Sequence, residues 1–338
     1  MSELSPSGIL PCQAIEALIA DGSITAREPF APGQVQPASL DLRLAERAWR
    51  VRASFLPGLG RKVADRLPDV AMHALDLTGG AVLERGCVYI AELAERVRMP
   101  AGMRARANPK SSTGRVDVFV RLLTDHGPTF DDVAAGYEGP LYLEIAPQTF
   151  SVLARTGTRL SQLRLKVGAP PLLAAVDVDV DLTGALAGYR ARRHAGIIDL
   201  DREDGHDPRD FWEAIEPRKG EVLLDPGEFY ILASKQAVEI PAMQAAEMTP
   251  IDPAVGEFRV HYAGFFDPGF GAAETGSEGS RGVLEVRSHE TPFLLEDGQT
   301  VARLVYEPMT ERPARLYGEG GSHYQRQGLK LSKHFRAW

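Results

Sequence analysis

The sequence predicts a mostly β protein built as a tandem duplication of a small β-barrel or jelly-roll domain, with few short helices. Three observations predict this fold class. Glycine (33) and proline (24) are scattered between short β-branched and aromatic runs. Apolar and polar residues alternate over 39–44 and 141–145, which places the apolar side chains on one face of a strand. Finally, the chain matches itself at one recurring offset.

Composition limits the class of protein. The 338 residues are 44% hydrophobic and 25% charged, as in globular proteins, and are long enough for two domains of roughly 150 residues. Acidic residues outnumber basic ones by 46 to 38, and this net charge of −8 argues against a nucleic acid or an anionic membrane as partner. No apolar stretch reaches the length of a bilayer span and the first residues lack a signal-peptide pattern, so we expect a cytoplasmic protein. The two cysteines, Cys12 and Cys87, are too few for a disulfide framework or a thiolate zinc site.

The internal repeat has an offset of 141 residues and holds without gaps from position 86 to 157. Upstream the offset is 140, as in Asp41 with Asp181 and Arg50 with Arg190. Chance similarity between two β domains is the alternative, and the length of the gap-free match argues against it. The matching residues are Gly86, Tyr89, Ile90, Pro100, Pro109, Glu144 and Gly157 with Gly227, Tyr230, Ile231, Pro241, Pro250, Glu285 and Gly298. We therefore expect one copy at about 35–167 and a second at about 175–308.

A helix is predicted before the first copy, over residues 11–20. Ile15, Leu18 and Ile19 form an apolar stripe at helical spacing, and the Asp-Gly pair at 21–22 ends it.

The domain boundaries follow from the repeat. We predict a first domain at 1–170, a second at 171–310 and a C-terminal tail at 311–338. Within the second copy, the charged segment 196–220 is predicted to be exposed. The tail is polar and glycine-rich around 318–321, which predicts a mobile segment.

One loop of the first copy has the composition of a phosphate site. Lys110 and Arg115 supply positive charge, while Ser111, Ser112 and the backbone near Gly114 supply hydrogen-bond donors. The loop is not a Walker motif, and an ordinary solvated turn is an equally good interpretation of the composition. The second copy has Ile-Asp-Pro at 251–253 instead, so it lacks this loop.

The second copy has a different candidate segment, the apolar, glycine-containing run at 259–271. Its glycines allow a close approach of the backbone and its aromatic side chains could wall a flat ligand in a hairpin-like structure. The matching stretch of the first copy, 121–139, has lost this pattern. Each copy thus carries half of a candidate site.

Two glutamates occupy matching positions in predicted strands, Glu144 and Glu285. A strand glutamate commonly faces solvent. If the other face of the strand is buried, however, alternation directs the carboxyl group towards a cleft. A partly desolvated glutamate there has a raised pKa, which suits proton transfer.

These motifs, in this order and spacing, resemble those of the 2′-deoxycytidine 5′-triphosphate deaminase family, which has a dUTPase-like β-barrel fold. The matching segments are 34–44, 109–115, 260–271, 284–286 and the tail segment 322–328. The ordinary family member is a single barrel about half this length that trimerises, so this sequence departs from the family by duplication. The resemblance implies a site shared between barrels, with the Ser-Ser loop from one and the base-holding segment and glutamate from the next. Whether the halves meet within one chain or between chains stays open.

The resemblance also implies roles for single residues. Glu285 matches the glutamate that relays protons as water attacks C4 of cytosine, and Ser111 and Arg115 match the residues that support this water and the phosphates; Glu144 stays the alternative glutamate. The nucleotide-binding positions implied are Lys110, Ser112, Gly114, His261, Ala263, Asp267, Tyr324 and Gln327. The tail is expected to fold over the triphosphate.

The implied activity is the hydrolysis of dCTP to dUTP and ammonia by a homo-oligomer, with Mg²⁺ bound through the triphosphate. The chain lacks the His-x-Glu and Pro-Cys-x-x-Cys motifs of zinc deaminases, so we expect a zinc-independent step with no protein metal site. A dUTP diphosphatase, a bifunctional enzyme that forms dUMP, and a non-catalytic nucleotide sensor are the alternatives.

Overall fold

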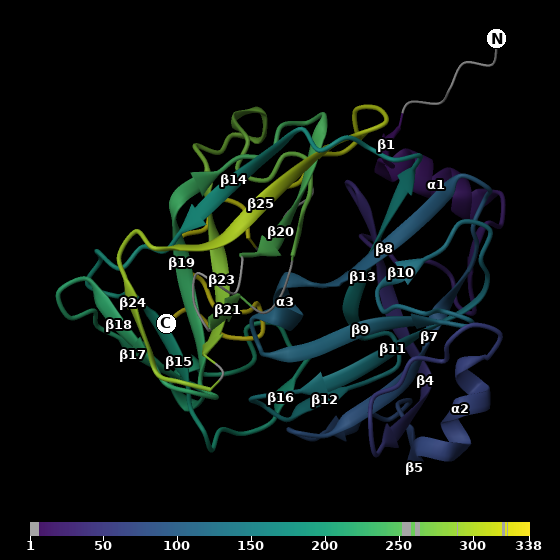
Figure 1. The fold of residues 1–338 in the computed structure, drawn as a ribbon, viewed down its shortest axis with the longest axis horizontal. Coiled ribbons are helices and arrows are strands. Elements are labelled where there is room, and N and C mark those ends of the chain that lie inside the picture. The colour runs from purple at the N-terminus through teal and green to yellow at the C-terminus, as the bar shows by residue number, and fades with distance from the viewer. Residues whose placement is uncertain (1–6, 252–257, 261–263, 289, 320–321, 323) are drawn as a thin grey trace.

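The computed structural model describes residues 7–251, 258–260, 264–288, 290–319, 322 and 324–338. It has two β-rich lobes, one from each copy, with the short helix α3 (Ser111–Gly114) between them (Figure 1). The predicted fold class, mostly β with few short helices, is confirmed. Within the described ranges, no helix has both the length and the apolar character that a bilayer crossing requires.

The predicted helix is present as α1 (Cys12–Ala20), which is preceded by Pro11 and followed by the capping residue Asp21. The sheet of the first lobe has the strand order β10-β8-β13-β4-β7-β11-β9. The elements of this lobe are β1 (Gly8–Ile9), α1 (Cys12–Ala20), β2 (Ile24–Ala26), β3 (Val35–Gln36), β4 (Ser39–Val51), α2 (Val63–Val70), β5 (Ala71–Asp76), β6 (Ala81–Leu83), β7 (Val88–Arg98), β8 (Met103–Pro109), α3, β9 (Val118–Thr124), β10 (Asp132–Val133), β11 (Glu138–Pro147), β12 (Val152–Ala154) and β13 (Arg159–Val167).

The second lobe has two main sheets, β14-β25-β20-β22 and β17-β15-β19-β23-β21, and the pair β18-β24. Its elements are β14 (Ala174–Asp179), β15 (Gly188–Ala191), β16 (Ile198–Asp199), the 3₁₀ turn Pro208–Asp210, β17 (Trp212–Ile215), β18 (Glu221–Leu224), β19 (Phe229–Val238), β20 (Gln244–Pro250), β21 (Phe258–Val260), β22 (Phe265–Phe266), the 3₁₀ turn Ala273–Thr275, β23 (Ser280–Ser288), β24 (Phe293–Glu296) and β25 (Thr300–Pro308).

Strand pairing confirms the duplication residue by residue. Glu144 of β11 lies opposite Ile90 of β7, and Glu285 of β23 lies opposite Ile231 of β19. Glu144 and Glu285 are 141 positions apart in the sequence, and so are Ile90 and Ile231. Since a one-residue slip would turn every side chain to the other face, an identical register means that the two copies share one pattern of buried and exposed positions.

The offset is not gap-free, however, and this part of the sequence prediction is wrong. Asp132 of β10 lies opposite Arg106, whereas Phe265 of β22 lies opposite Glu247, so β10 and β22 correspond at an offset of 133. The predicted hairpin at 259–271 is also wrong, because β21 pairs with β23 and β22 pairs with β20. The segment crosses between two sheets, and the residue spacing alone could not show which partners its strands take.

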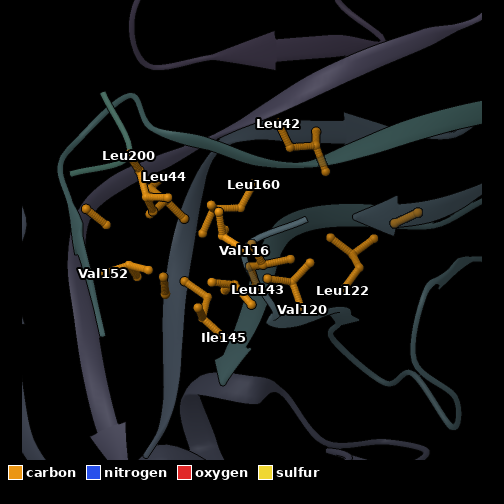
Figure 2. Packing of buried hydrophobic residues seen from close by; sticks show 14 of the residues in the cluster. Leu42, Leu44, Val116, Val120, Leu122, Leu143, Ile145, Val152, Leu160 and Leu200 are labelled. Atoms are coloured by element: carbon orange, nitrogen blue, oxygen red, sulfur yellow. The ribbon is translucent and has the colours of Figure 1, made fainter. Parts of the chain in front are cut away.

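The segment 196–220, predicted to be exposed, contributes to the core instead. Trp212 is fully buried against Phe150 of the first copy, with ring centroids 5.4 Å apart. Leu200 belongs to the same apolar cluster as Leu44 (Figure 2). Strand β16 extends the small sheet of the first copy by pairing in parallel with β12. Most charged residues of this segment are exposed, whereas several of its apolar residues are buried. The prediction is based on the charged composition and therefore misses the buried residues.

The tail is likewise packed, so its prediction as a mobile segment is wrong for the residues that the structure describes. Leu331 and Phe335 are buried in an apolar cluster to which both copies contribute, and the Phe335 ring packs on Trp212 with centroids 6.0 Å apart. Ser332 donates a hydrogen bond to the carbonyl oxygen of Ser112, at 2.9 Å. The tail therefore returns from the second copy to the first and covers α3.

Candidate functional site

A cleft of about 360 Å³ lies where the two lobes meet the tail. It is lined by α3 and the residues before it, by β22 and β23 of the second copy, and by the tail. The predicted site residues that line it are Lys110, Ser111, Ser112, Arg115, Asp267, Glu285, Tyr324 and Gln327. The structure thus brings the two predicted half-sites together within a single chain.

One described residue of the predicted set, Gly114, does not line the cleft. His261 and Ala263 lie outside the described residues. Gly114 is buried in α3, and its N–H donates to the carbonyl oxygen of Lys110 at 3.0 Å. Its backbone is therefore used inside the turn, so the prediction that it donates to phosphate oxygens is not supported by the geometry.

A buried carboxylate holds two cations at the cleft, one from the loop and one from β13. Lys110 Nζ lies 2.5 Å from Oδ1 of Asp41, and Arg159 lies 3.6 Å from Oδ2 of the same residue. Because Asp41 is almost fully buried, it fixes the two cations at one end of the cleft and leaves them a net positive charge. Arg159 is a site residue that the sequence analysis missed.

Arg115 joins the loop to the tail. Its guanidinium lies 3.9 Å from the centroid of the Tyr324 ring and donates to the carbonyl oxygen of Lys330 at 3.0 Å. Its Nε is buried without a hydrogen-bond partner among the described residues.

Glu285 lies in the middle of β23 and is 5% exposed. Burial raises the pKa of Glu285 to about 7, partly offset by the positive charge of Arg115 and by a backbone hydrogen bond, while the negative charge of Asp117 adds to the rise. Asp117 in turn forms an ion pair with Arg287. A carboxyl group with this pKa can both accept and return a proton near neutral pH.

Glu144, the matching glutamate of the first copy, has different surroundings. It forms an ion pair with Arg121 at 2.6 Å, and the Arg121 guanidinium stacks on Phe130 at 3.6 Å from the ring centroid. The same arginine donates to Ser54 Oγ at 2.9 Å. Glu144 is not among the residues that line the cleft, and its Oε1 is paired with Arg121.

Asp267 has a buried partner from the other copy. Arg164 of β13 lies 2.9 Å from Oδ1 of Asp267 and is itself fully buried. Burial raises the pKa of Asp267, and the charge of Arg164 opposes this rise. The sequence analysis missed Arg164, since an arginine within an alternating strand is ordinarily a solvent-facing residue.

The tail supplies the remaining wall. Gln327 Nε2 donates to the carbonyl oxygen of Arg281 at 3.0 Å, and its Oε1 is buried without a hydrogen-bond partner in the part of the chain that the structure describes. Tyr317 also lines the cleft, and burial raises its pKa above the ordinary value. The cleft therefore combines cations, unused polar atoms and aromatic rings.

No group of three or more His, Cys, Asp or Glu side chains that could hold a metal ion occurs within the described ranges. The described side chains therefore do not form a Mg²⁺ site made of protein ligands alone.

Both halves of the chain match domain models of a known family. The family model for the 2′-deoxycytidine 5′-triphosphate deaminase N-terminal domain matches residues 6–169, and the model for the C-terminal domain matches residues 157–335. A solved structure of 2′-deoxycytidine 5′-triphosphate deaminase from Agrobacterium tumefaciens is 52% identical, covering 90% of this chain and 99% of that one with a TM-score of 0.87.

Curated relatives match over a shorter segment. A dCTP deaminase of Halorubrum lacusprofundi is 32% identical over 132 residues, which are 38% of this chain and 62% of that protein. A protein of Halobacterium salinarum named "dCTP deaminase, dUMP-forming" is 30% identical over 141 residues, 41% of this chain and 69% of its own length. The match thus spans less than two thirds of the first relative. With both family domains present in order along its length, the chain belongs to the 2′-deoxycytidine 5′-triphosphate deaminase family.

Proposed function

We propose that this protein hydrolyses dCTP to dUTP and ammonia, with a single active site formed by both copies of one chain. One observation carries the proposal: the cation-bearing loop of the first copy and Glu285 of the second copy line the same cleft. The family membership supports the reaction, and the geometry of the cleft supports the roles of the residues.

The loop and the tail would bind the triphosphate. Lys110, Arg159 and Arg115 place three cations at the cleft, and the Ser111 and Ser112 side chains add hydroxyl donors. Mg²⁺ would be bound mainly by phosphate oxygens and water, because the described side chains provide no cage for it.

Glu285 would relay protons. Its carboxylate takes a proton from water as the water oxygen bonds to C4 of cytosine, and the carboxylic acid passes this proton to N3 as the C4=N3 double bond opens. The carboxylate then takes the proton of the new C4 hydroxyl group and passes it to N4, so that the C4–N4 bond breaks, ammonia leaves and the C4 carbonyl group of dUTP forms. A pKa of about 7 suits these transfers. Ser111 and Arg115 would hold the attacking water and stabilise the charge that develops, as hydrogen-bond donors positioned in a buried site do. This step requires no zinc, and a zinc-selective chelator in excess Mg²⁺ should leave the activity intact.

A second candidate is a bifunctional enzyme that continues to dUMP, which the name of the Halobacterium salinarum relative suggests. That reaction needs a carboxylate that activates water at the α-phosphate. Asp267 lines the cleft, but its Oδ1 is occupied by the ion pair with Arg164, so we favour dUTP as product.

The experiment is incubation of the purified protein with dCTP and Mg²⁺, with ammonia quantified and the nucleotide identified. Ammonia with dUTP supports the proposal. Ammonia with dUMP and pyrophosphate identifies the bifunctional enzyme, pyrophosphate released only from added dUTP identifies a diphosphatase, and binding without turnover identifies a nucleotide sensor.

We also propose that the protein is a homo-oligomer. Leu223 of β18 and Leu294 of β24 lie opposite each other and are 55% and 48% exposed. Such an apolar pair on a two-stranded sheet is a suitable contact for another copy. Light scattering after size-exclusion chromatography tests this, and a monomer at micromolar concentration would contradict it.

A further inference from the structure

Arg164 is a charged side chain placed where a barrel strand would ordinarily carry an apolar one. It is 0% exposed and is among the largest fully buried side chains of the described residues. A buried guanidinium is costly to desolvate unless its hydrogen bonds are satisfied, so its retention calls for a reason other than packing.

All polar contacts found for the guanidinium cross from the first copy to the second. Its Nη1 donates to the carbonyl oxygen of Ala246 at 2.8 Å. Its Nη2 donates to the carbonyl oxygen of Phe266 at 3.2 Å and to Oδ1 of Asp267 at 2.9 Å. The Phe265 ring lies under the guanidinium at 4.0 Å from its centroid. One side chain thus contacts three consecutive residues of the second copy.

Those three residues are a wall of the cleft. Phe265, Phe266 and Asp267 all line it, opposite the loop of the first copy. Because the planar guanidinium donates in fixed directions, it fixes both the backbone of this segment and the orientation of the Asp267 carboxylate.

The internal repeat provides a natural comparison. Arg164 lies opposite Arg106 in the first copy, and Val305 lies opposite Glu247 in the second, at the same offset of 141. The barrel fold therefore accepts valine at this position. The arginine occurs in the copy that faces the cleft-lining segment, and the matching position of the other copy has valine.

We propose that Arg164 is a positioning residue for dCTP, acting through Asp267 and the backbone of Phe265–Asp267 without itself lining the cleft. This inference rests on the proposed function. The fixed carboxylate accepts a hydrogen bond from a hydroxyl or amino group of the nucleoside, and the fixed backbone sets the width of the nucleoside end of the cleft.

The test compares Arg164→Met with Lys166→Met. Lys166 lies two residues along the same strand and also pairs with the second copy, through Glu307 at 2.6 Å, but it does not line the cleft or touch Asp267. Both variants remove one ion pair between the copies. We expect Arg164→Met to lower kcat/KM for dCTP on the order of 10²-fold, mainly by raising KM, and Lys166→Met to change it less than about twofold.

The pH profile separates positioning from a structural role. The charged and titratable groups around Asp267 are Arg164, Asp41 on β4, Lys110 before α3 and Tyr317 of the tail. Removing Arg164 removes the positive charge that opposes the raised pKa of Asp267, so the pKa of this carboxyl group rises further. We expect KM of Arg164→Met to fall as pH rises and this carboxyl group ionises, and KM of the wild type to change less over the same pH range.

Two further variants cover the case in which Arg164→Met does not fold. Arg164→Lys keeps the positive charge but loses the paired Nη1 and Nη2 donors of the guanidinium. This variant should retain the wild-type pH profile and lose part of its affinity for dCTP. Asp267→Asn should abolish the effect of Arg164→Lys on KM, because residues that act through one another are non-additive.

Each outcome is decisive. If Arg164→Met or Arg164→Lys leaves KM and the pH profile unchanged, or if Lys166→Met is equally impaired, the positioning role is wrong. If the wild type neither deaminates dCTP nor binds it in a calorimetric titration, the proposed function fails first, and that result is visible before any variant is made.

Discussion

Arg115 of the first copy lies over the ring of Tyr324 in the tail, with the guanidinium carbon 3.9 Å from the ring centroid. The two residues are far apart in the sequence, one in the first copy of the repeat and the other in the tail that follows the second copy. Their contact shows that the tail closes the cleft from the side of the loop and fixes the cation that faces Glu285.

The first prediction tests this contact. Tyr324→Leu removes the cation–π interaction, so KM for dCTP should rise between roughly two- and thirtyfold. Tyr324→Phe keeps the ring and serves as the control, with a change of less than about threefold. Equal effects of the two substitutions in steady-state kinetics would show that the ring over Arg115 is unimportant.

The second prediction concerns proton relay. Glu285→Gln keeps the shape of the side chain and should lower kcat on the order of 10²-fold or more, with dCTP binding retained. The wild-type kcat should rise with pH through about 7, because the base must be ionised. Glu144→Gln is the matched control, since Glu144 is paired with Arg121 away from the cleft. An inactive Glu144→Gln with an active Glu285→Gln would move the site to the first copy.

The third prediction follows from the linkage of stability to pH. The pKa of Glu285 is raised from 4.5 to about 7 on folding, so the native state binds this proton more tightly than the unfolded state does. The ionised form therefore destabilises the fold by about 3 kcal/mol above pH 7, and this cost disappears below about pH 4.5. Without ligand, Glu285→Gln should be more stable than the wild type in urea at pH 8, and the difference should shrink at pH 5. A constant difference across this range would contradict the raised pKa.

The fourth prediction concerns which chains build the site. Ser111 and Glu285 line one cleft in one chain, so each substitution inactivates the site of its own chain. Co-expressed Ser111→Ala and Glu285→Gln chains, purified through two different tags, should recover no deaminase activity. Wild type co-expressed with either variant provides the control for assembly. Partial recovery of the wild-type activity would instead place loop and glutamate on different chains.

The fifth prediction concerns the tail. Truncation after Arg315 removes Leu331 and Phe335 from the core, and each buried apolar side chain contributes roughly 1.5–3 kcal/mol. The truncated protein should therefore lose several degrees or more in Tm even without ligand. A shorter truncation after Phe335 should leave Tm within about 2 °C. An unchanged Tm on truncation after Arg315 would restore the interpretation of the tail as a mobile lid.

The sequence by itself determined what depends on near neighbours along the chain. Alternation predicted strands such as β4 and β11, and the apolar stripe predicted α1, because each is set by local periodicity. The repeat and the loop at 109–115 were also visible, since a duplication preserves spacing. Glu285 could be singled out for the same reason.

Only the tertiary structure decided which charges are buried and what they face. Glu144 and Glu285 have the same strand position and register, yet one is neutralised by Arg121 and the other faces the cleft. Arg164 looks like a surface residue in the sequence and is fully buried against Asp267. The tail looks mobile and is packed on α3. The burial of a side chain and the charges around it depend on residues that are distant in the sequence, so local composition cannot predict them. In this protein they are set by the contact between the two copies.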